Sequence, residues 1–168
     1  MIYIKYKTIP RETTMMQKKD LLILSNLRKD ARMSLTNMSK ATHIPISTIF
    51  DRLRMHEVGL IKKHTSLIDF EKLGFNTRAN VCIKVDKSKR EELREHLSKH
   101  QNVNSVFKIN NGYDFLAEVV FHNIKDLEEF MENLEERFNV TQTQVYYLIE
   151  DIKREEFMAD PLLMDLIN

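Results

Sequence analysis

The first third of the chain alternates apolar and polar positions in the pattern of three short helices. Residues 21–27, LLILSNL, are apolar on nearly every side and predict a central, buried helix. Ser34 is placed to cap a second helix, and residues 46–56 predict a third. His43 lies in the tight turn between the last two and is a residue type that tolerates a positive φ. This outline is a helix-turn-helix, which makes duplex DNA the first partner to consider.

The third helix has an inward and an outward face. Its helical spacing predicts four side chains toward the core: Ile46, Ile49, Phe50 and Leu53. The outward face then carries Ser47, Thr48, Asp51, Arg52 and Arg54. Hydroxyl groups can bond phosphates or base edges, and Arg can clamp a phosphate or a guanine. Asp51, which phosphates would repel, either accepts from a cytosine amino group or pairs with a neighbouring Arg.

A basic alternating segment follows this helix. Gly59 is expected to end the helix, and residues 61–68, IKKHTSLI, alternate as a strand that would form a wing. Lys62, Lys63 and His64 would lie beside backbone phosphates. The predicted DNA-binding residues are therefore Ser47, Thr48, Arg52, Arg54, Lys62 and Lys63.

The second half of the chain contains longer elements, some with the two-residue alternation of strands and some with the apolar spacing of helices. Strands are predicted at residues 79–85, 103–110, 114–121 and 140–152, and helices at residues 88–100 and 124–138. Asn-Asn-Gly-Tyr at 110–113 is typical of a hairpin turn. The order βαββαβ predicts an antiparallel four-stranded ferredoxin-like sheet with both helices on one face. The other face, with Tyr146 or Tyr147, favours burial against a second copy.

The predicted fold class is α+β, a winged helix-turn-helix followed by a ferredoxin-like domain. The expected segments are an extension at 1–17, the winged helix-turn-helix at 18–64, a linker at 65–78, the βαββαβ domain at 79–153 and a tail at 154–168. The extension is interpreted either as an edge strand or as a basic arm. The tail predicts a short helix with Leu162, Leu163 and Leu166 apolar, docked on its own domain or on a twin subunit.

Charge divides along the same boundary. The net charge of +1 combines 15 Lys and Arg against 7 Asp and Glu in residues 1–78, a net of +8, with 11 against 18 in residues 79–168, a net of −7. A basic N-terminal half suits phosphates, and an acidic second half would be repelled by the same duplex. The composition, 42% apolar and 30% charged, has no membrane or secretion segment, so a cytoplasmic protein is expected.

Candidate chemistry is sparse. Cys82 is the single cysteine, which excludes a disulfide framework, and a small buried apolar side chain is expected there. His96 and His100 form the one histidine pair at i, i+4 spacing, more typical of a solvated helix face than of a metal site. No catalytic residue, metal ligand set or cofactor is therefore expected.

Five stretches of residues 18–153 form a recognisable series: DLLILSNLRKDARMS, STIFDRLR and VGLIKKHTSLIDFEKLGF, and then FKINNGYDFLAEV and NVTQTQVYYLIEDIK. In this order and spacing they resemble the Lrp/AsnC, or feast/famine, family of prokaryotic transcription regulators. The resemblance implies a regulator that binds specific double-stranded DNA as a homodimer joined through its C-terminal sheets, often within octamers. It also implies a small effector, commonly an amino acid, near hairpin loops between subunits. The expected effector positions are Asn111, Gly112, Tyr113, Asp114 and Thr143, of which Tyr113, Asp114 and Thr143 match the family pattern.

Three departures from the family pattern carry their own expectations. The segment from Arg52 to Gly59 is one residue short, so Met55 is expected to take the place of an inward Leu. Pro45 replaces the usual capping serine, which leaves Ser47 or Thr48 to cap the third helix. The effector loop has Asn-Gly-Tyr-Asp in place of Gly-Asp-Tyr-Asp, so one carboxylate is missing.

Two other functions fit the same two-domain pattern. One is an architectural protein that coats DNA with little sequence preference. The other is a ligand-sensing module without DNA binding, or an enzyme, since sirohaem decarboxylases share the layout. Binding that spreads along DNA without a preferred site would favour the first, and a coloured, tetrapyrrole-bound protein the second.

Overall fold

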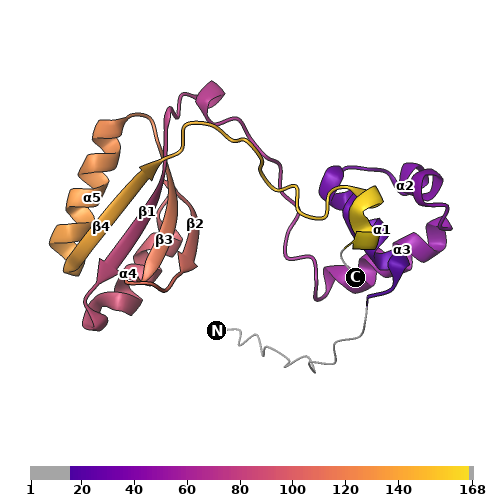
Figure 1. The fold of residues 1–168 in the computed structure, drawn as a ribbon, viewed down its shortest axis with the longest axis horizontal. Coiled ribbons are helices and arrows are strands. Elements are labelled where there is room, and N and C mark those ends of the chain that lie inside the picture. Colours follow the sequence, from indigo (N-terminus) through magenta and orange to yellow (C-terminus); the bar gives the residue numbers. More distant parts are fainter. Residues whose placement is uncertain (1–15, 167–168) are drawn as a thin grey trace, which may run out of the picture. The chain divides into compact units, whose positions relative to one another are not determined.

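The computed structural model describes residues 16–166, which form two compact units (Figure 1). The N-terminal unit runs to Ser66 and also includes the segment from Lys153 onward, while the sheet unit is Leu67–Ile152. The chain therefore passes between the units twice. Residues 1–15 of the predicted extension, which was expected at 1–17, lie outside the described residues, as do the last two residues of the tail.

The N-terminal unit is built from α1 (Lys18–Lys29), α2 (Leu35–Thr42) and α3 (Ile46–Glu57). Its core is a small cluster in which Ile23 of α1 meets Met38, Ile44 and Ile49. Leu27, Leu35 and Leu53 pack against this cluster, each one helical turn from the buried residue of its own helix, so each of the three helices buries one face. The helix-turn-helix predicted from the sequence is confirmed.

The C-terminal tail packs on α1 within the same unit. Its 3₁₀ helix η3 (Pro161–Leu166) lies against α1 (Figure 1). The Arg28 guanidinium donates to the backbone oxygens of Glu155, at 2.7 Å, and Phe157, at 2.9 Å. The tail was expected on its own domain or on a twin; here it returns to the helical unit, so α1 is covered on two sides.

The sheet unit has the predicted βαββαβ order. Its elements are β1 (Thr77–Val85), α4 (Arg90–Lys99), β2 (Val103–Lys108), β3 (Phe115–Phe121), α5 (Ile124–Phe138) and β4 (Val140–Tyr147). Short 3₁₀ turns, η1 (Glu71–Leu73) and η2 (Lys87–Lys89), flank β1. The strands pair antiparallel in the order β2-β3-β1-β4. The ferredoxin-like prediction is confirmed.

Alternation along β1 and β3 decides which face of the sheet is buried. Val81 and Ile83 of β1 share one apolar core with Leu93 of α4 and Leu134 of α5, so both helices cover the same face. The intervening residues lie on the open face, where Tyr146 of β4 pairs with Asn80 and is 51% exposed. Tyr147 pairs with Ala79 and so belongs to the helix side.

Candidate nucleic-acid interface

The turn between α2 and α3 is fixed by local hydrogen bonds. The Ser34 hydroxyl accepts from the Asn37 backbone N–H at 3.2 Å and caps α2, as predicted. His43 ends α2 with φ of 56°, which confirms its expected role as a turn residue. The Ser39 hydroxyl then donates to the Ile44 carbonyl at 2.6 Å. These contacts set the direction in which α3 begins.

The outward face of α3 carries exposed polar groups. Ser47, Asp51 and Arg54 are exposed and Thr48 is half-buried. Within residues 16–166 the Arg54 guanidinium forms no ion pair, so it is available to an external anion. Arg54 therefore lies where the sequence predicted it.

The start of α3 differs from expectation. Pro45 is its N-cap residue and no side chain caps the helix, so Ser47 and Thr48 do not take over that role. Residues inside the first turn have helical backbones that point their hydroxyls away from the free N–H groups, which an N-cap side chain would reach. The first turn of α3 therefore presents backbone donors without a side-chain acceptor, a feature that favours phosphate binding.

Arg52 was expected in the outward set and is instead turned toward α1. Its Nη1 lies 3.1 Å from Asp20 Oδ2, and its Nη2 donates to Gln17 Oε1 at 2.8 Å. The reason is helical phase, because position 52 is three residues after buried Ile49 and so lies at the edge of the inward face. The expectation that Arg52 faces the groove was wrong.

The inward position near the end of α3 is held by a histidine. Met55, expected inward, is 54% exposed, whereas His56 is 8% exposed and its Nε2 lies 2.9 Å from Asp20 Oδ1. The one-residue shortening moves His56 into phase with Ile49 and Leu53. The chain compensates for a polar residue in that place with Asp20, itself 3% exposed.

Sequence reasoning missed this network, which joins α1 to α3 through Asp20, Arg52 and His56. The available indication was the i, i+4 spacing of Arg52 and His56, which places two cationic side-chain types on one stripe. A buried carboxylate opposite that stripe is the acceptor they need.

Two apolar residues of α3 also face differently from expectation. Ile46 is 45% exposed and Phe50 is 52% exposed, although both were expected in the core. The core cluster of this unit is small, and Ile49 and Leu53 already fill the space that α3 faces. Ile46 and Phe50 therefore lie toward the outward set.

The predicted wing strand is absent from the described residues. Residues 61–69 are irregular, and Lys62 and Lys63 are exposed there. A strand needs a hydrogen-bonding neighbour, and every strand of the described chain belongs to the sheet unit. Lys62 and Lys63 were predicted on that strand and lie instead in an irregular segment that follows α3.

The hairpin turn between β2 and β3 holds the predicted effector residues. Asn111 and Gly112 have φ of 62° and 95°, which Asn and Gly tolerate. The Tyr113 hydroxyl donates to Gln144 Oε1 at 3.2 Å and accepts from Gln142 Nε2 at 3.0 Å. The structure thus brings Tyr113 to the two glutamines of β4 that lie on the open face of the sheet.

Asp114 is buried beneath this turn and is already engaged. Its carboxylate accepts from the Val85 backbone N–H at 3.1 Å and lies 2.7 Å from Arg90 Nη2 and 3.8 Å from Lys84 Nζ. Thr143 pairs with Ile83 and therefore lies on the helix side, apart from Tyr113. The five predicted effector residues thus fall into separate groups.

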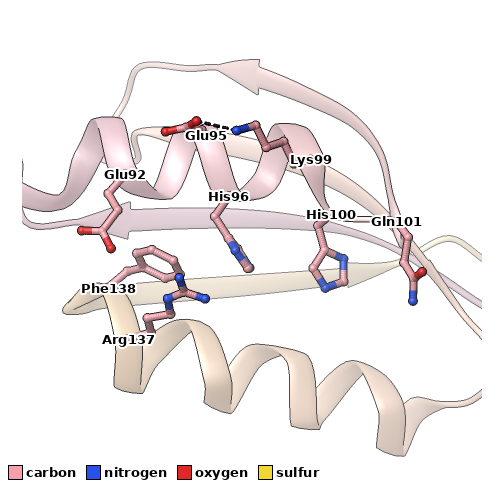
Figure 2. A pocket seen from close by; sticks show the side chains of 8 residues that line it. All are labelled: Glu92, Glu95, His96, Lys99, His100, Gln101, Arg137 and Phe138. Carbon is pink, nitrogen blue, oxygen red and sulfur yellow. Dashed lines mark hydrogen bonds and ion pairs between the residues drawn. The ribbon is translucent and has the colours of Figure 1, made fainter.

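A groove between α4 and α5 is lined by other residues (Figure 2). Its volume is about 500 Å³, and the imidazoles of His96 and His100 point into it beside Arg137 and Phe138. Partial burial lowers the pKa of both histidines, and the nearby His100 and Arg137 charges lower that of His96 further. The groove does not include the hairpin residues 111–114.

Comparisons with known proteins agree with this division. The family model described as "winged helix-turn-helix DNA-binding" matches residues 16–55, and that described as "Lrp/AsnC ligand binding domain" matches residues 78–157. The HTH-type transcriptional regulator FL11 of Pyrococcus furiosus is 33% identical over 114 residues, covering 67% of this chain and 76% of the relative. FL11 of Pyrococcus horikoshii is 32% identical over the same length and shares.

Solved structures share the fold. LrpC of Bacillus subtilis superposes with a TM-score of 0.74 at 21% identity, covering 83% of this chain and 97% of that one. A Neisseria meningitidis transcriptional regulator, solved with L-Met, gives a TM-score of 0.76 at 20% identity, with 83% and 93% covered. The chain belongs to the Lrp/AsnC family of DNA-binding transcription regulators, whose second domain binds ligands. In the described residues, no helix is both long enough and apolar enough to cross a membrane.

Proposed function

We propose that this chain is a homodimeric regulator that binds specific sites on duplex DNA in the cytoplasm and changes its binding when an amino acid or a similar small effector is present. The observation that carries the proposal is the outward face of α3, where Arg54, in the last turn, is exposed and forms no ion pair with the described residues, and where the first turn of the same helix has no side-chain cap. The exposed cation and the free backbone N–H groups at the start of the helix each suit the sugar-phosphate backbone, and an exposed helix suits a major groove.

The DNA-binding residues of this proposal are Ser47, Thr48, Arg54, Lys62 and Lys63. Arg52 has a different part. Because its guanidinium is held by Asp20 and Gln17, it would fix the angle of α3 on α1 and so position the other contacts.

Dimerisation would use the open face of the sheet. Tyr146 and Phe107 are 51% and 55% exposed there, and β1, a central strand, places half-buried Cys82 between them. Large apolar side chains on a sheet face are stabilised by burial against a second copy. A dimer would present two α3 helices to successive major grooves, and further assembly toward an octamer would add half-sites.

The effector would bind at the hairpin, where Asn111, Gly112 and Tyr113 are accessible beside Gln142 and Gln144. Asp114 would support that hairpin from beneath, since its oxygens already accept from Arg90 and Val85. The Neisseria relative solved with L-Met supports an amino acid as the class of ligand to test first.

A selection from random duplexes, run with and without a pool of amino acids, tests the proposal. We expect a defined sequence to be enriched, with an affinity that falls steeply as salt rises and changes with one of the amino acids. Retention of duplexes without any preferred sequence would indicate an architectural DNA-binding protein instead of a sequence-specific regulator. Failure to retain any duplex at low salt would refute DNA binding itself.

A further inference from the structure

Two large apolar side chains lie on the surface proposed for DNA. Ile46 and Phe50 are 45% and 52% exposed, and their i, i+4 spacing places them side by side along α3. Arg54 continues the same row one turn later. An apolar pair in line with an exposed arginine is an unusual composition for a surface that meets only phosphates.

The row diverges from the core stripe of the helix. Ile49 is fully buried and Leu53 packs against the same cluster, so the inward positions of α3 are already filled. Phe50 follows Ile49 directly, which turns it by about 100° from the buried stripe, toward the side of Ser47 and Arg54. Its exposure is therefore a consequence of position rather than of loose packing.

The major groove offers one apolar group to such a side chain. Each base edge there presents hydrogen-bond donors and acceptors, and thymine alone adds a C5-methyl group. Contact of a phenyl ring or a branched alkyl chain with that methyl is favourable, because it removes apolar surface from water. Cytosine, guanine and adenine offer no comparable apolar group.

We propose that Phe50, with Ile46 beside it, contacts thymine methyl groups in the major groove and thereby gives this chain part of its sequence preference. The inference rests on the proposed function, since α3 must enter the groove, and it deepens that function by naming the base. Arg54, one turn further along, would fix the register of the helix by a phosphate or guanine contact.

Uracil substitution isolates the methyl group without changing any Watson–Crick pair. The duplex preferred by the full-length chain is prepared with single thymines replaced by uracil, one position at a time. We expect uracil at one or two positions of each half-site to weaken binding by about threefold to fourfold per methyl, the value of one buried carbon group. Binding at the remaining positions should not change.

Two variants assign the effect to the residue. Phe50→Ala should bind the thymine duplex more weakly and should lose the difference between thymine and uracil at the same positions. Met55→Ala is the matched control, because Met55 is also exposed, at 54%, on the opposite side of α3; it should keep the difference. The melting temperature of both variants should match that of the parent, because neither side chain is in the core.

The outcomes separate this inference from the function beneath it. Specific binding with equal affinity for thymine and uracil at every position would overturn the inference and leave the regulator intact. A uracil effect that persists in Phe50→Ala would assign the methyl contact to another residue. A Phe50→Ala chain that changes its oligomeric state, with no uracil effect in the parent, would show that this row contacts a second copy instead.

Discussion

The two units of this protein hold their functional elements in different ways. Among the described residues, the sheet unit buries a cluster of fifteen apolar residues, whereas the cluster of the N-terminal unit has four. Each unit also contains a buried aspartate with cationic partners, Asp20 in one and Asp114 in the other. The contacts of the buried aspartate therefore contribute a larger share of the stability in the N-terminal unit, because its small apolar core supplies less free energy to hold its helices.

The partners of the two aspartates show the difference. Asp20 of α1 is joined to Arg52 and His56, both on α3, so it connects two elements of the small core. Asp114 joins Arg90 and the Val85 amide, at positions where strands and helix are already held by apolar contacts. In the N-terminal unit the network around Asp20 connects α1 to α3, and in the sheet unit the contacts of Asp114 support a loop.

The largest effect is expected from Asp20→Ala. Removal of the carboxylate leaves buried His56 without its partner and Arg52 with Gln17 alone, which costs about 3–5 kcal/mol for a buried pair. Hydrogen exchange followed by mass spectrometry should show faster exchange in α1 and α3 and unchanged exchange in β1. Lys19→Ala, at an exposed neighbouring position, is the control. Equal hydrogen-exchange protection of α3 in parent and variant would show that the network does not stabilise the N-terminal helices.

Asp114→Ala should have a smaller effect, confined to the sheet unit. The Val85 N–H and the Arg90 guanidinium each lose an acceptor, at about 1–3 kcal/mol for unsatisfied buried groups. We expect the sheet to remain folded, because its apolar cluster is untouched, with faster exchange at the hairpin and in the last residues of β1. Complete unfolding of the sheet unit would show that its apolar core alone does not keep the sheet folded.

Deletion of residues 153–168 probes the second support of the N-terminal unit. The tail accepts hydrogen bonds from Arg28 of α1, so its loss should lower the stability of that unit by about 1–2 kcal/mol and leave the sheet unit unchanged. Arg28→Ala should reproduce part of the loss. If α1 exchanges at the parent rate in the truncated chain, the tail does not support the helices.

The smallest effect is a pH dependence of the sheet unit. His96 and His100 have a pKa below the ordinary value in the folded chain, so the unfolded chain binds more protons near pH 6. The stability of the sheet unit should therefore decrease as pH falls through about 6.5, the unfolded value. Denaturant midpoints of the parent and His96→Gln at pH 7.5 and 5.5 measure this, with exposed His64→Gln as control. If the denaturant midpoint of His96→Gln fell as much between pH 7.5 and pH 5.5 as that of the parent, the prediction would be contradicted.

The sequence alone predicted best those features that depend on residues close together in the chain. The period-2 alternation of residues 79–85 and the Asn-Gly turn at 111–112 led to the βαββαβ order, and His43 to the turn before α3. It predicted least where partners are distant. His56 is buried because Asp20, thirty-six residues earlier, accepts its hydrogen bond, and no periodicity of α3 alone separates it from Met55.

The absence of a wing strand and the separation of the effector residues were not predictable for a related reason. Alternation at 61–68 describes a strand only if a neighbour pairs with it, and that neighbour is not written in the segment. For the effector residues, membership of a hairpin did not reveal that Asp114 is occupied from beneath and that Thr143 lies on the helix side of β4.

The salt dependence of DNA binding tests the central claim most directly, that the outward face of α3 contacts the duplex. The affinity of the full-length chain for its selected site is measured across salt concentrations beside Arg54→Ala and Arg94→Ala, the latter an exposed arginine on α4. We predict that Arg54→Ala lowers the log-log slope by about 0.9 for each phosphate that the variant no longer neutralises, while Arg94→Ala leaves it unchanged. An identical slope and affinity for Arg54→Ala and the parent would contradict the claim.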